Sequence, residues 1–203
     1  MKICVNSRQS NTFAAEKKDT KLRDWETTRQ EKSRVSRPEV PRQKEQPMKR
    51  IAVFPGSFDP ITLGHRSIVL RALPMFDEIY VAVGINMEKR STFELQDRIK
   101  WCEAVFADYP NVKVESYEGL TADFCKKVGA NVIIRGLRCG SDFEYENMIG
   151  HANKRLHPEL ETIFLLTESE LVGVSSSVVR DIYKNGGDTS KFLPVEVKLP
   201  EKQ

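Results

Sequence analysis

The stretch KRIAVFPGSFDPITLGHRSIVLRALPMF, residues 49–76, decides the fold of this chain. Residues 50–54 form a short apolar run typical of a buried strand, and residues 64–74 have the apolar spacing of a helix. The turn that joins them holds two glycines, two prolines, an aspartate and one of only three histidines in the chain. Backbone N–H groups at the start of a helix lack helical partners and attract anions. Gly64 and His65 therefore predict an anion site at the mouth of this helix, and a plain turn with a surface histidine is the alternative.

Strand-like and helix-like segments go on alternating beyond this stretch. Further strands are predicted at 78–84, 112–116, 131–135 and 161–166. Further helices are predicted at 94–107, 120–128, 141–155 and 176–185, the last ending in a left-handed stop at Asn185-Gly186-Gly187. Short apolar strands joined by connections long enough for a helix favour a parallel sheet covered on both faces. We therefore predict an α/β fold: a single Rossmann-like domain with a five-stranded parallel sheet and helices on both faces.

The first 47 residues differ in composition from the rest of the chain. They hold 12 Lys and Arg and 7 Asp and Glu, so their net charge is +5. The whole chain has a net charge of +3, so residues 48–203 carry −2. They carry few aliphatic side chains and end in SRPEVPRQKEQP, so they cannot bury enough apolar surface to offset the entropy of ordering. We predict a disordered extension over 1–47 and one domain over 48–203. Either translation begins at Met48 or the extension is a genuine flexible tail, and mass spectrometry of the native N-terminus would distinguish the two.

Composition excludes several classes of function. With 39% hydrophobic and 30% charged residues, the chain has the profile of a soluble globular protein. No apolar run approaches the roughly 18 residues of a membrane span, and the first residues lack the apolar stretch of a secretory signal, so we expect a cytoplasmic protein without a membrane partner. The slightly acidic domain has no electrostatic footprint for nucleic acid. The four cysteines form no C-x-x-C pair, so we expect free thiols and no metal ligands.

Cationic groups and hydroxyls follow the predicted strands. In open parallel sheets, ligands bind beyond the carboxyl ends of the strands. Arg135 ends the strand at 131–135, and the loops contain Arg138, Lys89 and three serines at 175–177 that begin a helix. The fork-like donors of the two arginines suit phosphate oxygens. Solvated surface charges and simple helix capping are the alternatives, and Asp59 is predicted to be a structural turn former.

Two common nucleotide signatures are absent from the sequence. Neither G-x-G-x-x-G after the first strand nor G-x-x-x-x-G-K-[ST] occurs, and no activated nucleophile is evident. A site built from histidine, lysine, arginine and helix N-termini positions substrates and stabilises charge, which is what phosphoryl or nucleotidyl transfer requires.

Three motifs together, FPGSFDPITLGH, VIIRGLRCGSDFEYE and VSSSVVR, closely resemble those of the bacterial phosphopantetheine adenylyltransferases. That family belongs to the nucleotidyltransferases with an H-x-G-H or T-x-G-H motif, here Thr62 to His65, and the resemblance runs from about Lys49 to Pro194. It implies transfer of an adenylyl group from ATP to 4′-phosphopantetheine, giving dephospho-CoA and pyrophosphate in the penultimate step of coenzyme A synthesis. It also implies Mg²⁺ as cofactor and a homohexamer.

The resemblance also assigns roles to residues. It makes His65, Lys89 and Arg138 catalytic. His65 would hold the ATP phosphates and supply charge as pyrophosphate leaves. It implies an ATP site at Ser57, Phe58, His65, Gly136, Leu137, Arg138, Glu146, Leu171, Val172, Gly173, Val174, Ser175, Ser176 and Ser177. Ser57, Lys89, Thr121 and Arg135 would bind the phosphopantetheine. The sequence departs from the family's pattern at Leu171, where an aromatic residue is frequent, and at Thr121, where an apolar one is frequent.

Three other functions compete with this prediction. Another nucleotidyltransferase, acting on nicotinamide mononucleotide or glycerol phosphate, would not carry RGLRCGSDFEYE, a pattern tied to the phosphopantetheine enzymes. A regulatory nucleotide-binding module without catalysis would not need to retain His65, Lys89, Arg138 and the serines. A nucleic-acid binder acting through residues 1–47 would show salt-sensitive DNA binding that is lost on their deletion.

Overall fold

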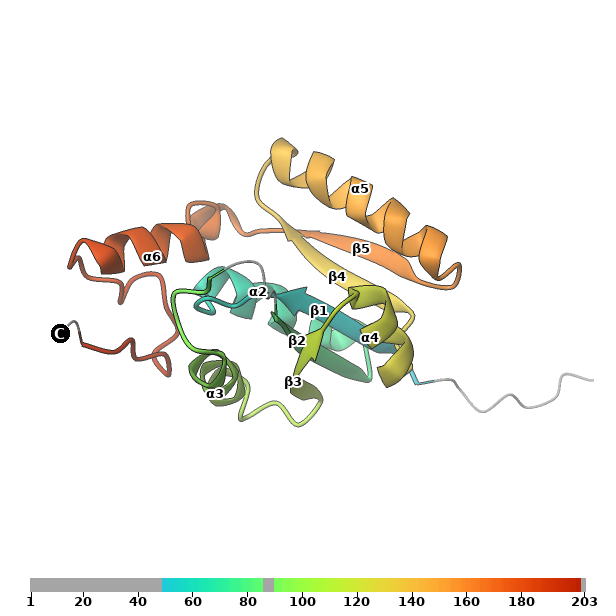
Figure 1. Ribbon diagram of the computed structural model, residues 1–203, viewed down its shortest axis with the longest axis horizontal. Coiled ribbons are helices and arrows are strands. Elements are labelled where there is room, and N and C mark those ends of the chain that lie inside the picture. Colours follow the sequence, from blue (N-terminus) through green and yellow to red (C-terminus); the bar gives the residue numbers. More distant parts are fainter. Residues whose placement is uncertain (1–48, 86–89, 202–203) are drawn as a thin grey trace, which may run out of the picture. The chain divides into compact units, whose positions relative to one another are not determined.

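Five parallel strands form one sheet in the order β3-β2-β1-β4-β5 (Figure 1). The strands are β1 (Ile51–Gly56), β2 (Glu78–Ile85), β3 (Val112–Glu118), β4 (Val132–Leu137) and β5 (Glu161–Leu166). All four neighbouring pairs are parallel, as the alternation of strands and helices predicts. The computed structural model describes residues 49–85 and 90–201, which belong to one unit, Pro47–Gln203. The predicted extension over 1–47 lies outside the described residues.

Helices cover both faces of the sheet. They are α2 (Leu63–Ala72), α3 (Leu95–Val105), α4 (Thr121–Val128), α5 (Gly140–Leu156) and α6 (Ser176–Lys184), with short 3-10 turns at Leu73–Met75 and Ser169–Leu171. Side chains of α2, α3 and α6 share one buried cluster with alternate residues of β1 and β2 such as Ala52 and Ile79. The other face of β1 and β2, at Val53 and Tyr80, packs against α4, and Figure 1 shows α5 alongside β4 and β5. Among the described helices, none is long and apolar enough to cross a membrane.

Four strands end later than the sequence predicts: β2 by one residue, and β1, β3 and β4 by two each. β1 continues through Pro55 and Gly56, because both residues stay in register with β2, where Gly56 lies opposite Val83. β4 likewise includes Gly136 and Leu137, which continue the pairing with β5. A Cβ on Gly136 would lie only 3.1 Å from Cγ1 of Ile68, so the glycine allows β4 to lie close to helix α2. These positions were predicted to be loop residues because glycine and proline are uncommon inside strands.

The centre of the sheet is paired over only a short length. β1 pairs with β2 over six residues but with β4 only at Ala52 and Val53, opposite Val132 and Ile133. β1 and β4 therefore separate toward their carboxyl ends. The chain order also reverses between these two strands, and ligands bind at this point in open α/β sheets.

Helix α6 stops where the sequence predicts. Asn185 is its C-cap, and Gly186 has a φ of +75°, in the left-handed region that favours glycine. After this stop the chain continues without a helix or strand, and its Leu193 and Val197 are buried in the core beside α2 and α6. The carbonyl of Phe192 accepts a hydrogen bond from the backbone N–H of Leu63 (3.0 Å), so the C-terminal segment contacts the first turn of α2.

Candidate active site

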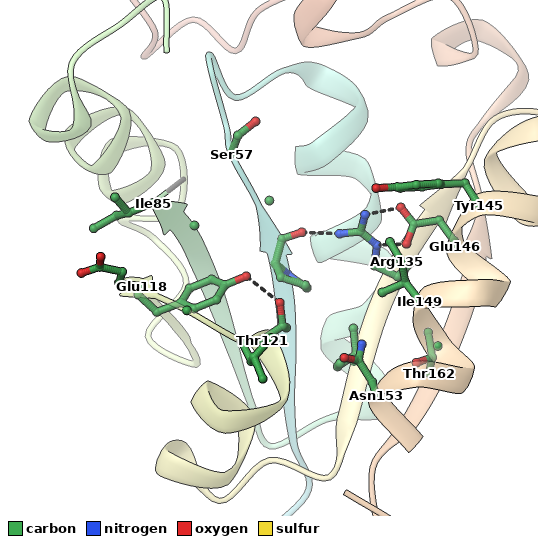
Figure 2. Close-up of a pocket in the computed structure, with 18 residues that line it drawn as sticks. Ser57, Ile85, Glu118, Thr121, Arg135, Tyr145, Glu146, Ile149, Asn153 and Thr162 are labelled. Carbon is green, nitrogen blue, oxygen red and sulfur yellow. Dashed lines mark hydrogen bonds and ion pairs between the residues drawn. The ribbon is translucent and has the colours of Figure 1, made fainter. Parts of the chain in front are cut away.

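Two cavities lie at the carboxyl ends of β1 and β4 and share a wall. The larger has a volume of about 850 Å³, and the smaller, of about 340 Å³, lies over the start of α2 and α6. Figure 2 shows Ile85, Glu118 and Thr121 on one side of the larger cavity and Tyr145, Ile149 and Asn153 on the other. The residues that line both cavities are Pro55, Gly56, Ser57, Arg135 and Glu146. Two ligands in these cavities would therefore meet at this shared wall.

An ion pair stands in the shared wall. The guanidinium of Arg135 donates through Nε (2.6 Å) and Nη2 to the two carboxylate oxygens of Glu146, and through Nη1 to the carbonyl of Pro55 (2.6 Å). The Arg135 and Glu146 side chains are 26% and 11% exposed, so the pair is largely removed from water. Arg135 thus joins β1 to β4 where their backbone pairing has ended, and Glu146 balances its charge.

His65 closes a capping box at the start of α2. Its Nδ1 accepts a hydrogen bond from the backbone N–H of Thr62 (3.0 Å), while the Thr62 hydroxyl accepts from the backbone N–H of His65. An imidazole nitrogen that accepts this bond carries no proton, so in neutral His65 the proton is on Nε2. His65 lines the smaller cavity, where Nε2–H is a hydrogen-bond donor.

The electrostatic surroundings keep His65 neutral. Burial, together with the positive charges of Arg135 and Arg138, lowers its pKa from 6.5 to about 4. The expectation that His65 supplies charge is therefore wrong for the free protein. The side chain offers a hydrogen bond, and the positive charge around the cavity comes from Arg135, Arg138 and Arg180.

The lowered pKa of His65 predicts an acid-dependent loss of stability. The unfolded chain protonates this residue near pH 6.5 but the folded protein only near pH 4, so the unfolded state binds more protons in this interval and stability falls with falling pH. The loss should reach about 3 kcal/mol when complete. Urea unfolding at about pH 7 and pH 5 should show about 2 kcal/mol of this loss, because the rest appears only as pH falls through 4, and His65→Gln should reduce the difference. An equal fall in stability from pH 7 to pH 5 in the wild type and in His65→Gln would show that the lowered pKa of His65 is not its cause.

The loop after β4 presents a second arginine. Arg138 donates through Nε and Nη2 to the two carboxylate oxygens of Asp142 (3.0 Å each), and its backbone N–H bonds to the same carboxylate. Arg138 lowers the pKa of Asp142 through these hydrogen bonds, against the opposing effect of burial. Both residues and Gly136 line the smaller cavity. Asp142 therefore orients Arg138, a role that the sequence analysis did not assign.

The three serines have different partners. The Ser175 hydroxyl accepts from the backbone N–H of Val178 (3.3 Å) and caps α6, whereas Ser176 donates to the carbonyl of Pro60 (2.8 Å). The Ser177 hydroxyl accepts from Nη2 of Arg180 (3.3 Å). All three line the smaller cavity at the N-terminus of α6, a position that favours an anion. Simple capping therefore accounts for Ser175 alone.

The larger cavity combines apolar walls with a few polar groups. The hydroxyls of Thr121 and Tyr117 are 2.7 Å apart, and on the opposite wall α5 contributes Ile149 and Asn153. Thr121 is predicted from the sequence, whereas Tyr117, Ile149 and Asn153 are not. Ile149 and Asn153 follow Glu146 by three and seven positions, so helical spacing from Glu146 would have identified them.

Not every predicted site residue lines a cavity. Phe58 is 1% exposed, its ring packs against His65, and it lines neither cavity. Leu137 is likewise buried. Of the four residues at 171–174, Val174 lines the smaller cavity, whereas Leu171, Val172 and Gly173 do not. Lys89 lies outside the described residues.

Comparison with known proteins gives a consistent result. The family model for cytidylyltransferase-like proteins matches residues 53–182. The phosphopantetheine adenylyltransferase of Flavobacterium psychrophilum is 53% identical over 150 residues, which are 74% of this chain and 99% of that protein. The enzyme of the same name from Cytophaga hutchinsonii is 50% identical over 74% of this chain and 100% of its own length.

A solved structure is similar in fold. It is a putative nicotinate-nucleotide adenylyltransferase from Vibrio parahaemolyticus, with a TM-score of 0.57 and 21% identity, covering 73% of this chain and 90% of that one. At this identity the likeness bears on the fold alone.

Proposed function

This chain belongs to the phosphopantetheine adenylyltransferase family, and we propose that it transfers the adenylyl group of ATP to 4′-phosphopantetheine, forming dephospho-CoA and pyrophosphate. The shared wall of the two cavities is the structural observation that supports this activity best. A transfer between two phosphorylated substrates requires two adjoining sites, with cationic groups and donors where the phosphates meet. Ser57 and Arg135 stand at that junction.

The arrangement favours direct transfer. The phosphate of phosphopantetheine would attack the α-phosphorus of ATP, while the bond from that phosphorus to the leaving pyrophosphate breaks. No covalent intermediate with the protein is needed. The protein would supply alignment, for which up to about 7–11 kcal/mol is available in well-oriented reactions. It would also supply donors to the departing pyrophosphate: Nε2–H of His65, Arg138 and the serines at the N-terminus of α6.

We assign the substrates to the two cavities by their chemistry. The smaller cavity, with its arginines, His65 and the helix N-termini, would hold the ATP phosphates, with Glu146 toward the ribose or adenine. The larger one, with Ile149 and Thr121 in its walls, suits the long and partly apolar arm of phosphopantetheine. Lys89 is kept as a catalytic candidate on the resemblance of its loop alone.

Mg²⁺ is the proposed cofactor. No group of three or more His, Cys, Asp or Glu side chains within 49–85 and 90–201 could hold a metal ion. The carboxylates at the smaller cavity, Asp142 and Glu146, are both engaged by arginines. These surroundings fit an ion held by the phosphate oxygens of ATP and by water, which would neutralise phosphate charge.

Pyrophosphate release tests the proposed reaction. The full-length protein is incubated with ATP, Mg²⁺ and either 4′-phosphopantetheine or nicotinamide mononucleotide, and pyrophosphate is measured with time. Release should occur with 4′-phosphopantetheine only. Release with nicotinamide mononucleotide only would show a different adenylyltransferase, and release with neither would contradict catalysis altogether.

We also propose a homohexamer and a cytoplasmic location. Apolar side chains are exposed on α5 and at the end of the edge strand β5, where Met148 is 64% and Leu166 71% exposed, and subunit contacts would cover them. Light scattering of the full-length chain should give six times its mass of 23.2 kDa. The described cysteines Cys102, Cys125 and Cys139 are unpaired, which suits a reducing compartment.

A further inference from the structure

Asp59 is a buried carboxylate whose partners come from distant parts of the chain. It is 6% exposed. One oxygen, Oδ2, accepts the backbone N–H of Thr92, and the other, Oδ1, accepts the backbone N–H of Phe93, each at 2.9 Å. The guanidinium of Arg180 lies 3.9 Å from Oδ2. Asp59 thus joins the β1–α2 turn to the residues that precede α3 and to helix α6.

Backbone carbonyls of the turn around Asp59 also accept hydrogen bonds from side chains of other elements. Arg98 of α3, which is 4% exposed, donates to the carbonyl of Ser57 (2.7 Å). Arg180 of α6 donates to the carbonyl of Asp59 itself (2.7 Å), and Ser176 to that of Pro60 (2.8 Å). The conformation of this turn is therefore determined by tertiary contacts with two helices.

These contacts hold a strained residue against His65. Phe58 has a φ of +45°, which is unfavourable for a residue with a Cβ and persists only where the surroundings enforce it. Its ring meets the imidazole of His65 edge-on, at 5.2 Å between centroids. Gly56 makes room for that ring, since a Cβ there would lie 3.0 Å from the ring atom Cζ. Phe58 thereby connects the Asp59 contacts to the imidazole of His65 at the smaller cavity.

We propose that Asp59 is a positioning residue of the active site, which holds Phe58 in its strained conformation and so sets the place of His65. A carboxylate suits this role because it offers an acceptor to each of the two N–H groups. An asparagine would offer one acceptor and would turn its amide N–H₂ toward the other backbone donor. The proposal rests on the transfer reaction proposed above. It gives a role in the active site to Asp59, which the sequence predicts only to be a structural turn former.

Asp59→Asn tests the proposal in the full-length protein. A displacement of about 1 Å can cost up to about 10²-fold in rate, so kcat for pyrophosphate release should fall roughly 10- to 100-fold while the KM for ATP changes little. The chain has only three histidines, so ¹⁵N spectra of histidine-labelled protein report directly on His65, assigned with His65→Gln. The variant should weaken the signature of the Nε2–H tautomer at His65 and leave the other two histidines unchanged.

Glu78→Gln is the matched control, because Glu78 is a buried carboxylate at the opposite end of the sheet that pairs with Lys49 and Lys113. It should lower the melting temperature and leave kcat and the His65 signals unchanged. If Asp59→Asn does not fold, Thr92→Pro removes one of the two donors at an exposed residue and should give a smaller fall in kcat.

A folded Asp59→Asn protein with wild-type kcat and unchanged His65 signals would overturn the proposal. So would a loss of kcat in Glu78→Gln that matches the loss in Asp59→Asn at equal melting temperature. A wild-type protein that releases no pyrophosphate would instead contradict the proposed reaction.

Discussion

Replacing His65 with glutamine should lower kcat by about 10²–10³-fold and leave the fold intact. A loss of this size is typical when one donor to a developing negative charge is removed. Glutamine at the third position of a helix can itself complete a capping box, since its side-chain oxygen accepts from the N-cap N–H, here that of Thr62. The variant therefore keeps the helix start, and in place of the fixed ring Nε2–H at the smaller cavity it has only the amide N–H₂ of a flexible side chain that is already tied to the cap. Steady-state pyrophosphate release measures the effect.

His65→Ala separates the two roles of the side chain. It should lose as much turnover as the glutamine variant and, in addition, about 1 kcal/mol of stability through the lost capping contact. Near-wild-type turnover in the alanine variant, which has no side-chain donor, would show that Nε2–H makes no contribution, and His65 would then be a capping residue only.

Arg135→Met should impair both stability and catalysis. The change leaves the Glu146 carboxylate, 11% exposed, without its partner, and it removes the donor to the Pro55 carbonyl. Breaking a buried pair typically costs 3–5 kcal/mol, and because the Arg135 side chain keeps 26% exposure we expect about 3 kcal/mol from urea unfolding. Turnover should fall by about 10²-fold, since a cationic donor at the junction of the substrates is lost.

The double variant Arg135→Met/Glu146→Leu distinguishes the two effects. It removes both charges together, so it should recover most of the lost stability while turnover stays low. A single Arg135→Met variant with wild-type stability and kinetics would contradict both the structural and the catalytic role of Arg135. Recovery of turnover in the double variant would show that the loss came from folding alone.

Local patterns in the sequence predict the fold well. Apolar runs and their spacing identify every strand and the main helices, and the rule for parallel sheets brings Ser57, Arg135 and Ser176 to one edge of the sheet. Ends of elements are less certain, because Pro55–Gly56 and Gly136 look like loop residues and stay in strands only through pairing with their neighbours.

Properties that depend on distant residues were not predictable from the sequence. The protonation state of His65 is set by burial and by Arg135 and Arg138, which are more than sixty positions away in the chain. The contacts of Asp59 likewise come from Thr92, Phe93 and Arg180, and nothing in the local motif indicates them. The resemblance identifies candidate site residues, but their hydrogen-bond partners and protonation states depend on how distant parts of the chain pack together.

The short pairing between β1 and β4 divides the sheet into two plates, β3-β2-β1 and β4-β5, with a narrow seam at Ala52 and Val53. Ser57 and His65 follow β1 in the chain, whereas Arg135 lies in β4 and Arg138 directly follows it. The relative positions of the reacting groups therefore depend on how β1 and β4 pair at Ala52 and Val53. Changes in side-chain volume at Ala52 or Val53, which line neither cavity, should disturb turnover more than their effect on stability suggests.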